Sequence, residues 1–299
     1  MHEYLGVLAA VLSSALGGIA GGTTRFVIGV TDPVTLGVFR FGTGFLILLP
    51  IALASGRRWP QGRDWIAAAL LGILFFFAFS VLFNLAYTFT TAARGALALS
   101  TMPVMTMLVA AAFGAERLSL RKTVGVVVAM GGVALALASG VGSAPPRAWR
   151  GEVVMLIATF CMSLYNVWSR PFMARADPLT FLTAGMGAAA ACLLAGAIVI
   201  GGFSAVRDFN TAHWLAIGYL GVLGSAVIFF LWVYALSHTT PTKTAVSITV
   251  NPIFAALVGA LVIGEPIGVD LIIGLIAVFA GIWIAATDRR SDPKPSLDS

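Results

Sequence analysis

Polar groups inside long apolar segments are the parts of this chain that could do chemistry. Pro103 and Pro252 each interrupt such a segment near its middle. A proline inside a helix removes one backbone hydrogen bond and displaces the carbonyl four residues earlier, here those of Leu99 and Ile248. The two prolines therefore predict two helix kinks whose carbonyls need partners. The polar side chains nearest to them, which would bind either the backbone or a ligand, are Ser100, Thr249 and Asn251.

A second group consists of amides, hydroxyls and aromatic rings. Exposing the amides and hydroxyls to lipid would cost free energy. We expect them to line an internal cavity that suits a molecule with an apolar body and a polar or zwitterionic head. A ligand ammonium would rest on an aromatic face there. The alternative is a structural or interfacial position, which is common for Trp and Tyr. The predicted lining residues are Asn84, Tyr87, Thr91, Tyr165, Asn166, Trp168, Trp232 and Tyr234.

Three cations lie inside the apolar segments or close to their ends. Arg94 and Lys243 each follow a Thr-Thr pair by about one helical turn. They are expected either to attract a carboxylate at opposite mouths of a pathway or to extend toward lipid headgroups. Arg40 lies deeper, and a buried guanidinium needs partners, so we expect it to bond to the backbone. Arg94 is therefore a predicted substrate-binding residue and Arg40 is not.

Carboxylates are informative by their positions. Those outside the C-terminal tail all fall in connections or at segment ends, so none is expected in mid-membrane. Proton-coupled export of organic cations commonly uses a buried carboxylate, which the sequence does not offer. No cluster of His, Asp, Glu or Cys has the arrangement of a catalytic or metal site. The sequence therefore predicts no enzyme, no metal and no cofactor.

The elements that must position these groups follow from composition. Apolar residues make up 59% of the 299 residues and charged residues only 10%, against about 25% charged in a typical soluble domain. A soluble globule is thereby excluded, and the absence of a basic run longer than two residues argues against nucleic-acid binding. The expected fold is an all-α integral membrane protein of ten spans. The spans are predicted at 4–24, 34–55, 65–86, 91–113, 121–139, 151–170, 178–201, 212–236, 241–263 and 268–287.

Loop charges predict the orientation of these spans. An even number places both termini on one side, and 12 of the cations fall on that side against 4 on the other. Because positive loops stay inside, both termini are expected in the cytoplasm. The first segment has Glu3 where a signal peptide would have a basic cluster, so it is interpreted as a span. Residues 288–299 are expected to form a disordered cytoplasmic tail.

The chain carries one pattern twice. A shift of 149 aligns Gly72 with Gly221 and Pro103 with Pro252, and for the first two spans of each half a shift of 145 aligns Arg25 with Arg170. The halves are predicted to be residues 1–140 and 141–287, with five spans each. Because five spans bring the chain to the opposite side of the membrane, the second half begins on that side and must be inverted relative to the first. Many carriers that work by alternating access have such inverted repeats.

These features resemble the EamA-type permeases of the drug/metabolite transporter superfamily, over nearly the whole chain. The resemblance rests on Arg40-Phe41 and on two prolines, each followed by a glycine and then a glutamate, at Gly114-Ala115-Glu116 and at Gly264-Glu265. It implies a carrier in a bacterial inner membrane, with a central cavity formed mainly by spans 1, 3, 4, 6, 8 and 9. This chain looks similar to the branch that exports amino acids, including aromatic ones. The expected partners are a small-molecule substrate and the bilayer, as a monomer or homodimer; the alternative is a proton-coupled, polyspecific exporter of organic cations.

Overall fold

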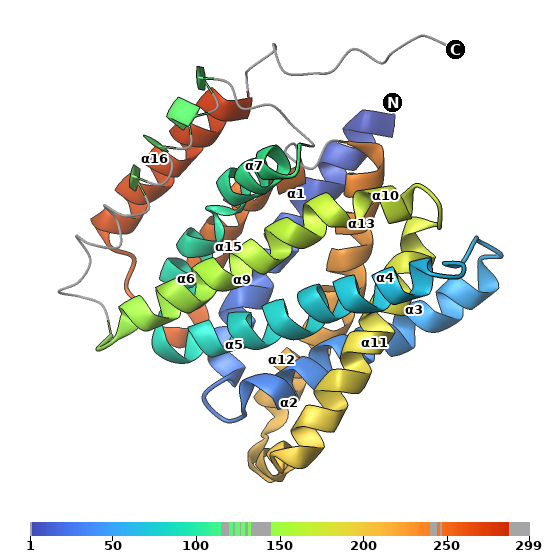
Figure 1. The fold of residues 1–299 in the computed structure, drawn as a ribbon. Helices are drawn as coiled ribbons and strands as arrows, with labels where there is room; N and C mark the ends of the chain where they lie inside the picture. The colour runs from blue at the N-terminus through green and yellow to red at the C-terminus, as the bar shows by residue number, and fades with distance from the viewer. Residues whose placement is uncertain are drawn as a thin grey trace.

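The fold is a bundle of long helices (Figure 1). The computed structural model describes residues 2–114, 145–239 and 247–286, together with short stretches at 120–121, 123–125, 127–128, 131–132 and 244–245. All the elements formed by these residues are helical. The predicted tail at 288–299, Glu116 and Lys243 lie outside the described residues, and the predicted span 121–139 lies largely outside them.

Seven helical stretches of the described residues are long and apolar enough to cross a bilayer, so the chain is an integral membrane protein. They match seven of the predicted spans to within a few residues: Tyr4–Val27, Pro33–Ala54, Asp64–Phe89, Ala92–Ala112, Ala148–Trp168, Pro178–Val199 and Thr211–His238. A shorter apolar helix, Ser247–Ile263, occupies part of the predicted span 241–263. Helix α16 (Val269–Ala286) occupies the predicted span 268–287.

Several of these stretches are divided into shorter elements. The first part of the chain contains α1 (His2–Val27), α2 (Pro33–Gly37), η1 (Val38–Gly42), α3 (Thr43–Ala54), α4 (Asp64–Gly72), η2 (Ile73–Phe79), α5 (Ser80–Phe89), α6 (Ala92–Leu99) and α7 (Met102–Ala112). The second part contains α9 (Ala148–Trp168), α10 (Arg170–Met173), α11 (Pro178–Val199), η4 (Gly202–Asp208), α12 (Thr211–Gly221), η5 (Val222–Val227), α13 (Ile228–His238), η6 (Ser247–Val250), α15 (Asn251–Val258), η7 (Gly259–Ile263) and α16.

An Asp-Pro-x-Thr motif occurs twice in the chain, at residues 32–35 and 177–180, and each copy begins a helix. The Oδ1 atom of Asp32 accepts hydrogen bonds from the backbone N–H groups of Val34 and Thr35, each at 2.9 Å. In the second copy, Oδ1 of Asp177 accepts from the N–H of Leu179 at 2.9 Å. A carboxylate at the cap satisfies N–H groups that have no partner in the helix, and proline suits the first helical position.

The repeated glycines Gly72 and Gly221 also share a local structure. Each is followed at once by a π-helical segment, η2 or η5, in which the backbone bonding is looser than in an α-helix. A Cβ on Gly72 would collide with the backbone of Gly185 in α11, and a Cβ on Gly221 would lie 2.7 Å from Cβ of Thr43. Both positions therefore need glycine so that helices can approach closely.

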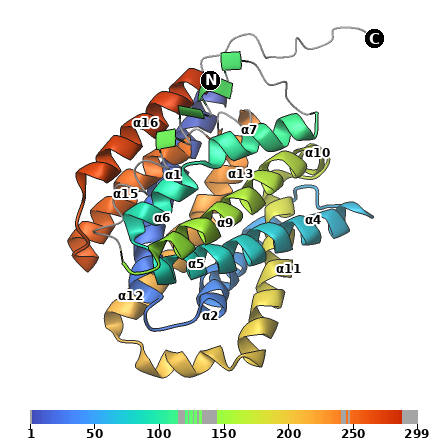
Figure 2. The ribbon, with the colours of Figure 1, turned by 60° about the vertical axis from the view of Figure 1, so that its left-hand side comes forward.

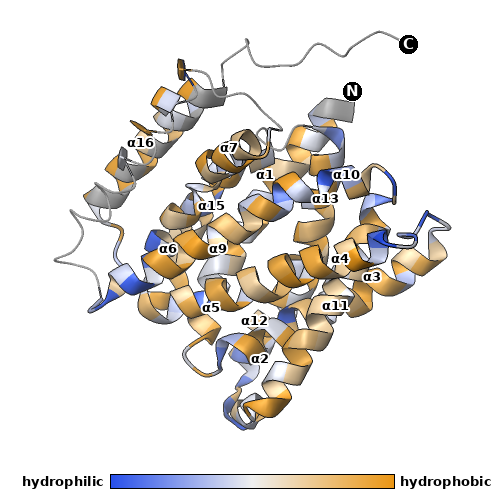
Figure 3. Cartoon of the chain, in the orientation of Figure 1, coloured by the Kyte–Doolittle hydropathy of each residue, from blue (hydrophilic) through white to orange (hydrophobic). Residues whose placement is uncertain are grey.

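The interior and the exterior of the bundle are both apolar. Inside, Tyr165 stacks on Phe75 with the ring centroids 4.4 Å apart, and Phe229 meets Phe75 edge-on at 5.3 Å. Outside, large side chains such as Leu70 and Val199 are exposed, and polar residues gather toward the helix ends (Figure 3). An apolar exterior of this extent is what contact with lipid requires.

Helix α16 lies at one edge of the bundle, as a view from a second direction also shows (Figure 2). Its Ala277 is the nearest neighbour of a Cβ placed on Gly132. The small residues of the predicted fifth and tenth spans thus meet within one chain at this position.

The contact between Gly72 and Gly185 yields a stability prediction. Gly72→Ala should destabilise the protein by about 1–3 kcal/mol, because the new methyl group forces α4 away from α11. Gly218→Ala in α12 is the matched control, since a Cβ there meets nothing within 4 Å. Thermal unfolding in detergent checks this, and equal melting temperatures for the two variants would refute the close packing.

Candidate functional site

A cavity lies among the long helices, close to the centre of the described chain. The cavity has room for ordered water, with about 40 Å³ open to the centres of water-sized molecules. Spans 1, 3, 4, 6, 8 and 9, which the family resemblance implied, all contribute residues to the wall of this cavity, and span 2 contributes Arg40. The lining residues are Ser13, Ser14, Gly17, Arg40, Phe79, Phe83, Leu99, Met162, Ile228, Phe229, Trp232, Ile248 and Asn251.

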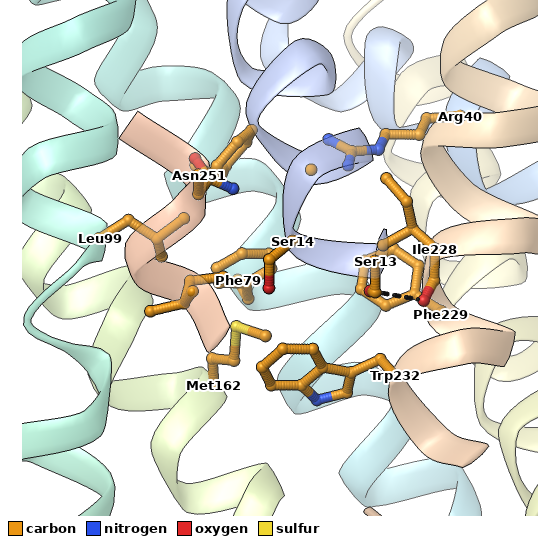
Figure 4. A pocket seen from close by; sticks show the side chains of 13 residues that line it. Ser13, Ser14, Arg40, Phe79, Leu99, Met162, Ile228, Phe229, Trp232 and Asn251 are labelled. Carbon is orange, nitrogen blue, oxygen red and sulfur yellow. Dashed lines mark hydrogen bonds between the residues drawn. The ribbon is translucent and has the colours of Figure 1, made fainter. Parts of the chain in front are cut away.

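Helix α1 supplies two hydroxyl groups to the polar part of the wall. The hydroxyl of Ser13 donates to the backbone carbonyl of Ile228 at 2.9 Å (Figure 4). The hydroxyl of Ser14 lies 2.9 Å from that of Ser247, which itself donates to backbone carbonyls. Asn251 faces α1 and its Oδ1 atom is buried with no hydrogen-bond partner among the described residues. These groups offer a polar ligand both donors and acceptors.

Aromatic rings, the thioether of Met162 and aliphatic side chains form the apolar part of the wall. Trp232 is held in place because its indole N–H donates to Oδ1 of Asn166 at 3.2 Å. The amide nitrogen of Asn166 in turn lies 3.8 Å from Sδ of Met102. Asn166 therefore acts behind the wall, fixing the ring of Trp232, while Trp232 itself lines the cavity.

Of the predicted substrate-binding residues only Trp232 and Asn251 line the cavity, and Arg40 is among the polar lining residues that sequence reasoning missed, together with Ser13 and Ser14. Its Nε and Nη2 atoms both donate to the carbonyl oxygen of Gly224, at 3.1 and 2.9 Å, which confirms the expected bond to the backbone. The guanidinium carbon also lies 5.2 Å from the ring centroid of Phe41 and 5.4 Å from that of Phe83. The same side chain borders the cavity, which its position in the sequence could not show.

The two prolines mark helix breaks, as the sequence predicted. Pro103 lies in the first turn of α7, just after α6 ends at Leu99, and Pro252 lies in the first turn of α15, just after η6. Leu99 and Ile248, four residues before the prolines, both line the cavity. Of the predicted polar neighbours, Asn251 reaches the cavity. Thr249 is buried in η6, and the hydroxyl of Ser100 donates to the backbone carbonyl of Ala96 at 2.9 Å.

Four of the predicted lining residues are buried or partly buried next to other elements and do not border the cavity. Asn84 donates from Nδ2 to the carbonyl of Pro33 at 2.9 Å and so ties α5 to α2. Thr91 caps α6 by accepting from the N–H of Arg94. Tyr87 and Tyr165 are buried, and their hydroxyls lack a partner among the described residues.

Three further predicted residues lie away from the cavity. Arg94 forms an ion pair with Glu152, with Nε 2.7 Å from Oε1. Trp168 is partly exposed and meets Phe113 edge-on with the ring centroids 5.1 Å apart. Tyr234 stacks on the ring of His238 at 4.0 Å. None of these three residues is part of the cavity wall.

Ion pairs connect distant parts of the chain at the helix ends. Nε of Arg25 lies 3.2 Å from Oε1 of Glu265, whose Oε2 accepts from the N–H of Ala92 at the start of α6. In other connections, Arg57 pairs with Asp177 at 3.0 Å, and Arg175 pairs through two hydrogen bonds with Asp64. The charge-assisted bonds hold these connections together in this conformation.

A membrane-embedded helical bundle with a small central cavity of mixed polarity is the architecture of a multi-pass transporter. The sequence pattern of the EamA-like transporter family matches residues 4–138 and again residues 149–287. The chain belongs to this family, and it is therefore a membrane transporter and not an enzyme.

Related proteins agree with this membership. The chain is 28% identical to an uncharacterised transporter of Archaeoglobus fulgidus over 87% of this chain and 89% of the relative. It is also 28% identical to a probable terminal-alkyne amino-acid exporter of Streptantibioticus cattleyicolor, over 84% and 86% of the two chains. The crystal structure of another protein shares the fold with a TM-score of 0.67 at 20% identity, over 95% of this chain and 96% of the other.

The bond between Trp232 and Asn166 yields a second stability prediction. Trp232→Phe should cost about 1–3 kcal/mol, because it leaves Oδ1 of the buried Asn166 without its donor. Trp168→Phe removes the same atoms at a partly exposed position and should cost less. The measurement is the fraction of protein that stays monodisperse in detergent after heating, and equal loss in both variants would contradict this role for the indole.

Proposed function

We propose that the protein is a carrier that exports small metabolites, most of all amino acids including aromatic ones, by alternating access around the cavity described above. In this proposal ten transmembrane helices form two inverted five-helix units, residues 1–140 and 141–287. The membrane is the bacterial inner membrane and both termini are cytoplasmic, in line with the excess of cations on that side. The protein works as a monomer or homodimer.

The observation that carries this proposal is the symmetry of the cavity wall. Eight of the lining residues form four pairs, in which the two members are related by the sequence shift of 145 or of 149 residues. This pairing supports a cavity that lies between the two proposed halves. An inverted repeat places one site between two halves that can exchange conformations, which exposes the site to each side in turn. The pairs are Gly17 with Met162, Phe79 with Ile228, Phe83 with Trp232, and Leu99 with Ile248.

The helix breaks support the same arrangement. The π-helical segments η2 and η5 begin at Ile73 and Val222, which the shift of 149 aligns. Arg25 and Arg170, which the shift of 145 aligns, make similar hydrogen bonds. Arg25 donates to the backbone carbonyl of Tyr87, near the end of the third predicted span, and Arg170 donates to that of Thr239, near the end of the eighth. Broken helices next to a central cavity are typical of carriers, because they provide backbone groups to a substrate and points at which helices bend.

The chemistry of the wall supports an amino acid as substrate. Serine hydroxyls, an amide and a guanidinium suit a charged head group, and the aromatic faces suit an apolar side chain. The similarity to a probable amino-acid exporter agrees with this class of substrate.

The second candidate function is proton-coupled export of organic cations. It requires a carboxylate that exchanges a proton for the cation. No Asp or Glu lines the cavity within the part of the chain that the structure describes. The wall instead contains the cation Arg40, which would repel such substrates, so we favour the amino-acid carrier.

A flux experiment tests the carrier. Purified protein in proteoliposomes should give saturable uptake of radiolabelled phenylalanine or threonine that is insensitive to a pH gradient, and should not transport a quaternary-amine dye. Asn251→Ala should reduce the flux by about tenfold, because it removes a polar group from the cavity wall. Trp168→Ala, a substitution away from the cavity, is the control. Proton-driven flux of the dye would establish the cation exporter in its place, and no flux of any solute would refute a carrier.

Alternating access also predicts that ion pairs between the halves control access to the cavity. With Cys161 and Cys192 replaced by serine, Ser14→Cys places one thiol in the cavity wall. In this background, Glu265→Gln removes the ion pair between Arg25 and Glu265. Labelling of the introduced cysteine by a membrane-impermeant maleimide from outside should then rise by up to about fivefold, since a partly exposed ion pair contributes up to about 1 kcal/mol. Asp208→Asn, on a connection that forms no ion pair among the described residues, is the control. Unchanged labelling would show that Arg25 and Glu265 do not hold the pathway closed.

A further inference from the structure

Arg40 places a positive charge inside the cavity that no acidic side chain of the described residues neutralises. The side chain is 4% exposed, and a buried charge normally has a charged or strongly hydrogen-bonding partner. Its two hydrogen bonds both go to one carbonyl oxygen, that of Gly224. The described carboxylates that form ion pairs do so with other arginines, at the helix ends. The cavity is thus electropositive in this conformation.

A guanidinium can donate five hydrogen bonds, and Arg40 uses only part of that capacity. Among the described residues, no acceptor bonds to Nη1 of Arg40. The guanidinium end of the side chain is turned toward the cavity (Figure 4). A planar fork of donors with one unoccupied edge fits a carboxylate better than it fits any neutral group.

The position aligned with Arg40 in the second half of the sequence carries no charge. The shift of 145 that relates the first two spans of each half aligns Arg40 with Gly185. In the second half, Gly185 packs directly against the backbone of Gly72, and no cation stands there. Arg40 lies in the π-helical segment η1, whereas Gly185 lies in the continuous helix α11, so the arginine belongs to a local feature of the first half alone.

We propose that Arg40 binds the carboxylate of the substrate, so that the carrier selects metabolites with a carboxylate and rejects close analogues without one. This inference rests on the proposed function and names the part of the substrate that the cavity recognises. An amino acid would place its carboxylate on the open edge of Arg40. Its ammonium would donate to Oδ1 of Asn251 and rest against the aromatic wall, including the indole of Trp232.

The test compares molecules that differ only in the carboxylate. Binding of phenylalanine and phenylalaninamide, and of benzoate and benzamide, is measured on the full-length protein in nanodiscs by the shift of its melting temperature with concentration. Wild-type protein should bind at least one of the carboxylates at least about tenfold more tightly than its amide. In Arg40→Gln this preference should vanish, with amide binding unchanged. Arg40→Lys, which keeps the charge but loses the planar fork, should retain part of it.

Arg150→Gln is the control for net charge, because Arg150 is exposed on α9 next to Trp149. It should leave the preference unchanged. Equal binding of carboxylates and amides by the wild type, no binding of either, or an equal loss of both in Arg40→Gln would overturn the proposal. If Arg40→Gln does not fold, the wild-type comparison and Arg40→Lys still decide it.

The same probes separate this inference from the carrier proposal. Flux of phenylalaninamide equal to that of phenylalanine in proteoliposomes would sustain the carrier and refute the role of Arg40. A carboxylate preference in binding that Arg40→Gln abolishes, without flux of any solute, would sustain the site and refute the carrier.

Discussion

Hydrocarbon offers no hydrogen-bond partner, and this constraint governs the structure at every level. Each backbone N–H and C=O group inside the bilayer must be satisfied within the chain, which restricts the spans to helices. The helices deviate from regular α-geometry where Pro103 and Pro252 remove a donor and in the π-helical segments. The two proline breaks adjoin the cavity wall, where exposed backbone groups can meet a polar ligand or a neighbouring side chain.

The same constraint explains where charge is placed. Arg57 and Arg175 pair with carboxylates in connections outside the spans, where water still reaches them. Arg40 differs, because it carries its charge deep inside a span and, among the described residues, its hydrogen bonds go to one backbone carbonyl. Such a group costs free energy in an apolar interior, so its presence is best explained by what it does for a ligand.

Glycine has the complementary role of allowing the helices to meet. Gly72 and Gly185 bring α4 and α11 into backbone contact, and Gly132 meets Ala277 in the same way. Without a hydrophobic driving force between helices in lipid, close packing of small residues supplies much of the association energy. The breaks and the close contacts together leave a bundle of helices around a cavity.

The sequence by itself determined the membrane environment, seven of the helices, the repeated pattern and the positions of the proline breaks. Each of these follows from local composition or spacing, which the chain carries without reference to its neighbours. Which face of each helix points inward was decided only by tertiary packing. Trp232 reaches the cavity, whereas Trp168 does not, although the two side chains are identical. The position of Arg40 in the cavity wall likewise depends on a partner 184 residues away in the chain, which no local pattern reveals.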